Sequence, residues 1–333
     1  MLWMHLAGFV LLILAASEIF VNALEHLGER LGISEGVTGS LFAAVGTALP
    51  ETLVPLIALL AGTADPHANE AIGTGAILGA PLMLSTLSVS LLALVTLRRR
   101  GFQGEFAPER SGIVRDFNMF LASFSLACAV MFIPHGNAAL RLGFAFVLLL
   151  GYFLYVLVTL RASAHLVQSG HGTEAHAPLM LTRIGLPDHM AVLLFQLAAG
   201  IFMLVQGADG FIVAIHDAAP LLGISPLLLA LLIVPVATEL PEKVNSIRWV
   251  RHRRDTLAFG NITGAMVFQG SILPAIGIAL TDWQPHSEIM PGIVCTLAGA
   301  LWLRLCLMRG HLRVWQLGVN AALYAGYLAI SLH

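Results

Sequence analysis

The sequence predicts an all-α polytopic membrane protein of about ten transmembrane helices, arranged as two inverted five-helix repeats with proline-broken second and seventh helices. First, 58% of the 333 residues are hydrophobic and 11% are charged, whereas soluble domains carry about 25% charged residues. Second, a Thr-x-x-Pro-Glu motif occurs twice inside apolar runs. Third, the arginines concentrate in alternate connections between those runs. This composition leaves no room for a soluble domain.

At about 20–25 residues per crossing, the apolar runs divide into ten segments. The predicted crossings are residues 2–24, 36–61, 70–97, 112–133, 139–160, 188–215, 224–248, 256–280, 289–308 and 314–332. Residues 1–160 form the first repeat, 161–187 a cytoplasmic linker and 188–333 the second repeat. The apolar run after Met1 is expected to be a retained helix, because no basic residue precedes it.

The placement of the arginines predicts the orientation, because cytoplasmic connections carry an excess of Lys and Arg. One set of connections holds Arg30, Arg98, Arg99, Arg100, Arg110, Arg115, Arg161, Arg183, Arg248, Arg251, Arg253, Arg254, Arg309 and Arg313. The opposite connections, such as residues 62–69 and 281–288, hold none apart from Arg141. Both termini are therefore expected on the outer side of a bacterial inner (plasma) membrane.

The first Pro-Glu motif places Glu51 inside an apolar run, where a carboxylate costs about 2.5–3.5 kcal/mol on insertion scales. Pro50 cannot donate a backbone hydrogen bond and obstructs the preceding turn, which predicts a kinked or broken helix. Thr47 lies four residues before Glu51, on the same helix face. Freed carbonyls, a hydroxyl and a carboxylate together form a set of oxygens that suits a hard cation.

The same device recurs 191 residues later, at Thr238 and Glu242. Two such intramembrane breaks in corresponding halves indicate a transporter site at a repeat interface. An odd number of crossings in each repeat inverts the second repeat relative to the first. The third and eighth helices correspond with an offset of 185, which pairs two Gly-x-x-x-Gly segments and places Glu70 opposite Asp255 as expected helix caps.

These residues resemble the calcium/cation antiporter superfamily, which contains the sodium/calcium exchangers. Its repeats each carry a Gly-Thr-Ser-x-Pro-Glu-type break, followed one helix later by a Gly-Asn-x-x-Gly-Ser-Asn-type segment. Here the breaks lie at residues 46–51 and 237–242, and the following segments at 75–84 and 260–269. The resemblance implies Glu51 and Glu242 as principal cation ligands, with Thr47 and Thr238 contributing oxygens. It also implies alternating access, with the first and sixth helices sliding across a fixed core.

The sequence departs from the family pattern at positions that help coordinate sodium in the family. The serine of the break is Ala48 in the first half and Glu239 in the second. The last polar position of the following segment is Leu84 in the first half and Gln269 in the second. Glu239 and Gln269 therefore join the candidate cation ligands, and the match to a three-sodium site is incomplete.

Lys243, the single lysine of the chain, stands four residues after Glu239. One interpretation pairs the two side chains on one helix face. The other has the lysine extend to the headgroups of the inner leaflet. The sequence does not distinguish them.

Two carboxylates can hold one divalent cation or two protons. The expected function is therefore a secondary active antiporter that moves calcium or a similar divalent cation against sodium or protons. The alternative is a non-transporting or differently specific exchanger-like scaffold. An enzyme is not expected, because the nearest histidines, His26 and His252, fall in connections. No permanently bound cofactor and no nucleic-acid partner is expected. The partners are inorganic cations and the lipid bilayer, and the oligomeric state is open.

Overall fold

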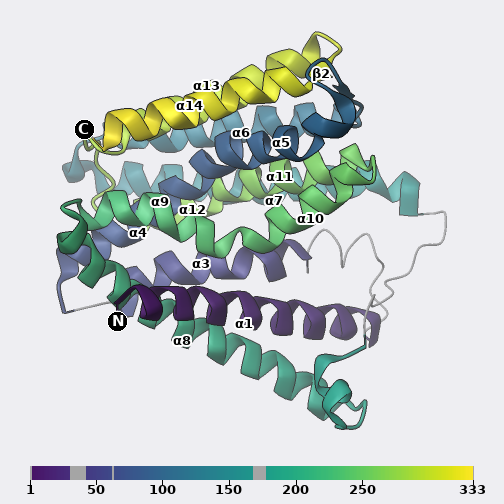
Figure 1. Cartoon of the computed structure of the whole chain (residues 1–333). Helices are drawn as coiled ribbons and strands as arrows, with labels where there is room; N and C mark the ends of the chain where they lie inside the picture. Colours follow the sequence, from purple (N-terminus) through teal and green to yellow (C-terminus); the bar gives the residue numbers. More distant parts are fainter. Residues whose placement is uncertain (1, 31–42, 62–63, 168–177, 333) are drawn as a thin grey trace.

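The structure is a computed structural model that describes residues 2–30, 43–61, 64–167 and 178–332 (Figure 1). It is predominantly helical, as predicted. Seven of the described helices are long and apolar enough to cross a membrane, and two shorter apolar helices cover Pro50–Leu60 and Pro226–Thr238. The prediction of an all-α membrane protein is therefore confirmed.

The described helices follow one another in long, roughly parallel rods. They are α1 (Leu2–Arg30), α3 (Ala43–Ala61), α4 (Pro66–Met83), α5 (Val89–Arg100), α6 (Arg110–Val130), α7 (Ala138–Val167), α8 (Met190–Leu222), α9 (Pro226–Thr238), α10 (Leu240–Arg251), α11 (Asp255–Gln269), α12 (Ile272–Leu280), α13 (Met290–Met308) and α14 (Val314–Ser331). A π-helical segment, η2 (Leu84–Ser88), joins α4 to α5, and short 3-10 helices are η3 (His135–Asn137) and η4 (Met180–Ile184).

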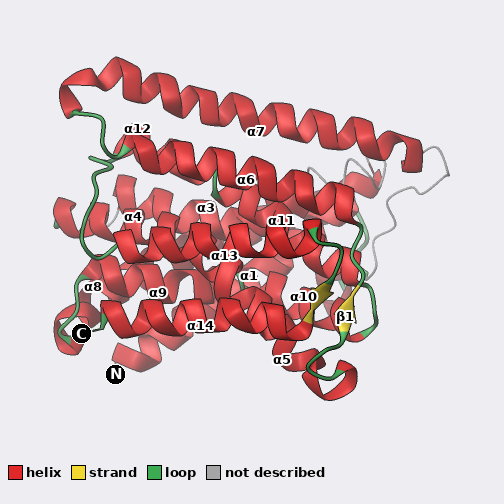
Figure 2. Cartoon of the chain, turned by 90° about the horizontal axis from the view of Figure 1, so that it is seen from above, coloured by secondary structure: helices red, strands yellow, loops and turns green. Residues whose placement is uncertain are grey.

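Both chain termini lie at one end of the bundle, which we call the terminal end (Figure 1). At the opposite end, β1 (Glu105–Phe106) pairs antiparallel with β2 (Leu312–Arg313), and we call this the paired-strand end (Figures 1 and 2). No pattern in the sequence predicted this pairing. Residues 36–42 of the predicted second crossing and 168–177 of the predicted linker lie outside the described residues.

The predicted seventh crossing is interrupted where the Pro-Glu motif predicts. Helix α9 ends at Thr238 and α10 begins at Leu240, with Glu239 between them at φ −93° and ψ 4°. The Glu239 amide closes α9 on the carbonyl of Pro235, at 3.1 Å. Pro241 carries no amide hydrogen, so it cannot complete the next helical bond.

The predicted break in the second crossing is wrong, because α3 continues without interruption through Pro50 and Pro55. A proline removes one backbone hydrogen bond and leaves the rest of the ladder intact. In a membrane bundle, neighbouring groups can satisfy the single freed carbonyl. The same motif therefore ends a helix in the second half and not in the first.

The third and eighth crossings carry interruptions that the sequence did not predict. In the third, the helix widens to π geometry from Leu84. In the eighth, α11 ends at Gln269 and α12 begins at Ile272. Leu84 and Gln269 correspond under the offset of 185 residues. Both halves of the sequence are therefore irregular at corresponding positions. Single π turns inside helices are frequent at functional sites.

Hydroxyl groups satisfy carbonyls at both interruptions. Thr86 Oγ1 donates to the carbonyl of Leu82 at 2.5 Å, and Ser271 Oγ donates to that of Val267 at 2.5 Å. In the π segment, Asn320 Nδ2 of α14 also donates to the carbonyl of Ser85 at 2.6 Å. These bonds make irregular backbone possible in an apolar interior.

Helices α4 and α9 touch backbone to backbone at the terminal end. A Cβ atom on Gly75 would lie 2.4 Å from the carbonyl oxygen of Leu227, and one on Gly79 would lie 2.2 Å from that of Leu231. Small residues four apart permit such close approach of membrane helices. At Gly264, the counterpart of Gly79, an added Cβ would meet no described atom within 4 Å.

The apolar core divides into two main clusters. The larger cluster includes α6, α13 and the faces of α4 and α11, with Phe117, Phe120 and Phe124 fully buried. The second lies between α1, α8 and the faces of α3 and α9 that turn toward them. Helices α1 and α8 pack along their length (Figure 1), while Glu18 and Asp209 on them are exposed.

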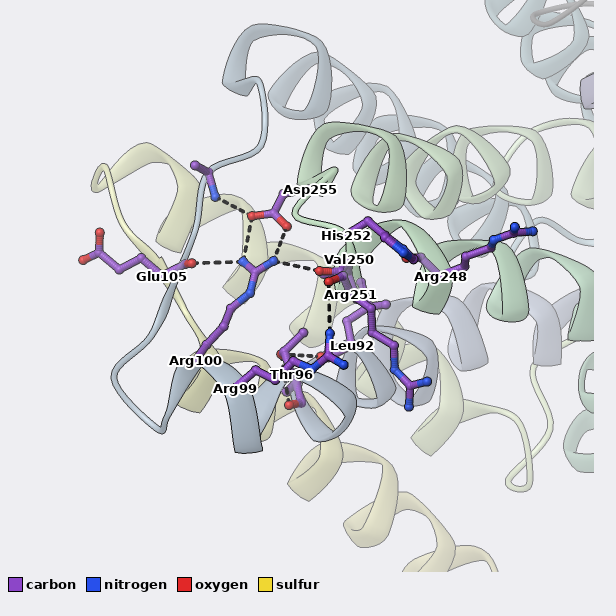
Figure 3. Close-up of polar contacts among 12 residues, drawn as sticks. Leu92, Thr96, Arg99, Arg100, Glu105, Arg248, Val250, Arg251, His252 and Asp255 are labelled. Atoms are coloured by element: carbon purple, nitrogen blue, oxygen red, sulfur yellow. Dashed lines mark hydrogen bonds and ion pairs between the residues drawn. The ribbon is translucent and has the colours of Figure 1, made fainter.

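The start of α11 is held to the end of α5 by a buried ion pair (Figure 3). Arg100 donates to both carboxylate oxygens of Asp255, at 2.6 and 2.8 Å, and to the carbonyls of Val250 and Glu105. The amide of Ala107 donates to Asp255 at 3.0 Å. The cap prediction for Asp255 is therefore wrong, since its carboxylate serves another helix and loop.

Glu70 forms the matching contact at the terminal end. Its carboxylate accepts the amide of Asp282, in the loop after α12, at 2.5 Å. Asp65 is the N-cap of α4 and accepts the amide of His67 at 3.0 Å, so the cap prediction for Glu70 is also wrong. Each half thus supplies, near the start of its own interrupted helix, a carboxylate that binds the loop after the other half's interrupted helix.

Glu109 caps α6 at the paired-strand end, where its carboxylate accepts hydrogen bonds from the amides of Ser111 and Gly112 at 2.8 and 2.9 Å. A hydrogen bond from the Ser111 hydroxyl, followed by the Gly112 amide, holds the pKa of the Glu109 carboxyl below its ordinary value. These bonds favour the ionised form. The carboxylate also lies near the positive end of the helix dipole.

Candidate cation site

The helix interruptions come together through direct helix contacts. Helix α4 packs against α3 and α9, α3 also contacts α9, and α10 packs against α11. The α9–α10 junction is therefore surrounded by the segments that follow both Pro-Glu motifs. The local backbone explains this arrangement, because the glycines of α4 admit α9 and Glu239 leaves helical geometry between α9 and α10.

Two candidate carboxylates are buried on these elements. Glu51 on α3 is 4% exposed, and Glu239 at the α9–α10 junction is fully buried. A buried charge is costly unless it is paired or binds a cation. Glu239 has a partner within the chain, because its Oε2 lies 3.1 Å from Lys243 Nζ.

Lys243 is 7% exposed and points into the core. Besides Glu239, its Nζ contacts the carbonyl oxygen of Pro235 at 3.2 Å and the Sδ of Met83 at 2.8 Å. The ammonium group thus lies between the α9–α10 junction and the last residue of α4. Of the two interpretations left open by the sequence, pairing with Glu239 is the one that the structure has, and the lysine does not extend to the headgroups.

Thr238 and Gln269 are both buried beside the junction, at 2% exposure each. The Thr238 hydroxyl donates to the carbonyl of Val234 at 3.2 Å, which leaves its oxygen lone pairs available. The Gln269 side chain interacts with the Glu239 carboxylate. Among the described residues, Gln269 Oε1 has no hydrogen-bond donor. A buried acceptor of this kind is suited to a cation.

The side chains of Thr47 and Glu242 lie outside the described residues, although their backbones belong to α3 and α10. The predicted approach of Glu51 to Glu242 therefore stays a prediction. Within the described part of the chain, no group of three or more His, Cys, Asp or Glu side chains is arranged to hold a metal ion.

The sequence reasoning missed Met83. It stands in the segment after the first Pro-Glu motif, one residue before the position that corresponds to Gln269. A methionine in an apolar run carries no polar signal, so its contact with Lys243 could not be anticipated.

Asp116 on α6 was missed as well, although a carboxylate inside a predicted crossing is itself a signal. Its two oxygens accept hydrogen bonds from Tyr155 at 2.8 Å and Thr263 at 2.7 Å. These bonds tie α6 to α7 and α11. Asp116 therefore acts in the described structure as a hydrogen-bonded link between helices.

A helical membrane bundle that has interrupted helices and carboxylates buried inside its apolar segments has the organisation of an ion transporter. Comparison with known proteins then gives the family directly: the sodium/calcium exchanger protein family matches residues 1–161 and 192–333. The chain belongs to that family, as its two Pro-Glu motifs predicted.

Several individual proteins are similar along most of the chain. The candidate antiporter CaxA of Alkalimonas amylolytica is 28% identical over 301 residues, which cover 87% of this chain and 81% of CaxA. The inner membrane protein YrbG of Escherichia coli is 24% identical over 302 residues, covering 90% and 87%. Among solved structures, an H⁺/Ca²⁺ exchanger, CAX, superposes with a TM-score of 0.74 at 18% identity, covering 99% of this chain and 86% of that chain. That likeness concerns the fold alone.

Proposed function

We propose that this protein is a secondary active antiporter that moves calcium, or a similar divalent cation, against sodium or protons by alternating access. The transported cations are its substrates, and no permanently bound cofactor and no enzymatic reaction are proposed. The family and its helical architecture support cation exchange as the activity. The choice of calcium and the mechanism are our inference.

The observation that supports the proposal is the burial of polar oxygen groups on α3, α9 and α11, since α3 contacts both of the other helices. Glu51, Thr238 and Gln269 are nearly inaccessible, and the Gln269 carbonyl oxygen has no donor among the described groups. Calcium takes six to eight oxygen ligands from carboxylates, amide carbonyls and water. We propose that Glu51 and Glu242 supply the charge, and that Thr47, Thr238, Gln269 and Glu239 complete the surrounding polar set.

We also propose ten crossings in two inverted repeats, with residues 161–187 as the cytoplasmic linker. The reciprocal contacts of Glu70 with the loop after α12, and of Asp255 with the loop after α5, support a pseudo-two-fold relation. The arginines at the paired-strand end support a cytoplasmic location for that end, because cytoplasmic connections carry an excess of basic residues. Both termini would then face outward from a bacterial inner membrane, a location that the similarity to YrbG supports.

Calcium uptake into everted membrane vesicles tests the proposal. Uptake should follow an imposed sodium or proton gradient and should collapse when that gradient is dissipated. The same vesicles carrying Glu51→Gln provide the site-specific comparison. Protein that inserts normally but moves no divalent cation under either gradient would favour a non-transporting scaffold instead.

A further inference from the structure

Lys243 has the surroundings of a bound monovalent cation. Its Nζ is held by a carboxylate oxygen of Glu239 at 3.1 Å, the backbone carbonyl of Pro235 at 3.2 Å and the thioether of Met83 at 2.8 Å. These three groups come from the α9–α10 junction, from α9 and from the end of α4. The side chain is 7% exposed, so water contributes little to its solvation.

Two of the three contacts of the ammonium, the oxygens of Glu239 and Pro235, are ligands that an alkali cation would also accept. A carboxylate and a carbonyl oxygen are hard donors for alkali cations, and an ammonium group carries the same single charge. The tether is short: Lys243 lies four residues after Glu239, and its amide bonds the Glu239 carbonyl at 3.1 Å. The lysine is therefore positioned on Glu239 by the first turn of α10.

The charges of the two Pro-Glu regions lead to the same conclusion. By sequence they hold three carboxylates, Glu51, Glu239 and Glu242, and one ammonium, Lys243. The net charge is two negative units, which a single divalent cation neutralises. Without the lysine, a third negative charge would remain, and a buried uncompensated carboxylate either takes up a proton or binds a cation.

We propose that Lys243 is a tethered cation that occupies, at Glu239, the place an exchangeable sodium or potassium ion would otherwise take. This inference rests on the proposed cation exchange and specifies its ion requirement: no monovalent ion binds at Glu239 during transport. Removing the ammonium should convert a fixed charge into a binding site for an alkali cation.

Thermal unfolding of the purified protein in detergent tests this inference without requiring transport. The probes are sodium and potassium chloride, each titrated against choline chloride at constant ionic strength. Lys243→Met should gain a saturable rise in Tm beyond any shown by wild type. The expected rise is about 3 °C when the cation is present at about ten times its Kd.

Arg248→Met is the matched control, because it removes one positive charge from an exposed position on the same helix. It should titrate as wild type does. Glu239→Gln combined with Lys243→Met removes both partners and should lose the gained cation response. A Lys243→Met titration that superimposes on wild type would overturn the proposal, since the pair would then be a structural ion pair only.

Folding of the single variant is itself informative. If Lys243→Met can be isolated only in high sodium or potassium, the cation replaces the ammonium and the proposal stands. If it cannot be isolated in either salt although the double variant can, an alkali cation does not fit there and the proposal fails. Absence of calcium uptake by wild type would refute the proposed function, and the unfolding titration would still decide the role of Lys243.

Discussion

Replacing Gly79 by alanine tests the backbone contact between α4 and α9. The new Cβ would lie 2.2 Å from the carbonyl oxygen of Leu231, whereas ordinary contacts begin at 3.4 Å. The two helices must therefore separate locally by about 1.2 Å, the difference of these distances. Overpacking a core typically costs about 1–3 kcal/mol. The upper end applies here, because the opposing atom is backbone and has no alternative rotamer.

Thermal unfolding in detergent measures the effect. At about 2 °C per kcal/mol, the Tm of Gly79→Ala should fall by about 6 °C. Gly264→Ala is the matched control, since this counterpart lies in α11 and an added Cβ would meet no described atom within 4 Å. The control should hold its Tm or raise it, because alanine favours a helix over glycine by about 1 kcal/mol. Equal Tm changes in the two variants would refute the close-packing argument.

Three further predictions concern charged groups. Glu51→Gln and Glu242→Gln should each lower calcium uptake by more than about tenfold. Membrane insertion should be unaffected, because the loss of a charge makes insertion easier. Calcium uptake that survives in both variants would contradict the role of these residues as ligands. Arg100→Met should destabilise the protein by about 3–5 kcal/mol, because the buried carboxylate of Asp255 loses its cationic partner. The measurement is the Tm, compared with that of Arg99→Met, which removes an exposed arginine. Glu109→Gln should be less stable than wild type at pH 7, and the difference in unfolding free energy should shrink as pH falls. The reason is that a carboxyl whose pKa is lower in the folded state stabilises the protein above its unfolded-state pKa, and this contribution is lost as pH falls through the folded-state pKa. A difference that stays constant from pH 7 to about pH 3 would contradict this prediction.

The predominantly helical architecture was predictable from the sequence because the length of an apolar run is a property of a whole helix. The chain keeps its helices close to the predicted positions, and the seventh crossing breaks at the Pro-Glu motif. The same motif failed at Pro50, because one missing hydrogen bond does not decide whether a helix continues. Glu239 supplies the difference at the second motif, since it leaves helical geometry between α9 and α10.

The candidate site was predictable in its residue types and only partly in its contacts. Four-residue spacing predicted the pairing of Glu239 with Lys243, and the structure has it. The thioether of Met83 comes from α4 and contacts Lys243 through the packing of two helices. Residue spacing within one helix does not predict such a contact. The caps expected at Glu70 and Asp255 failed for the same reason, because their partners lie in the other half of the chain.

The contact between Arg100 and Asp255 has a consequence for how the chain assembles. The two residues are separated by 155 positions, so Arg100 enters the membrane region long before its carboxylate is synthesised. Until then the guanidinium must remain solvated at the interface. The amide of Asp282 likewise meets Glu70 only after α12 is complete. Neither contact can therefore form before the later part of the chain has been synthesised, and the packing of these two helix starts requires residues from both parts.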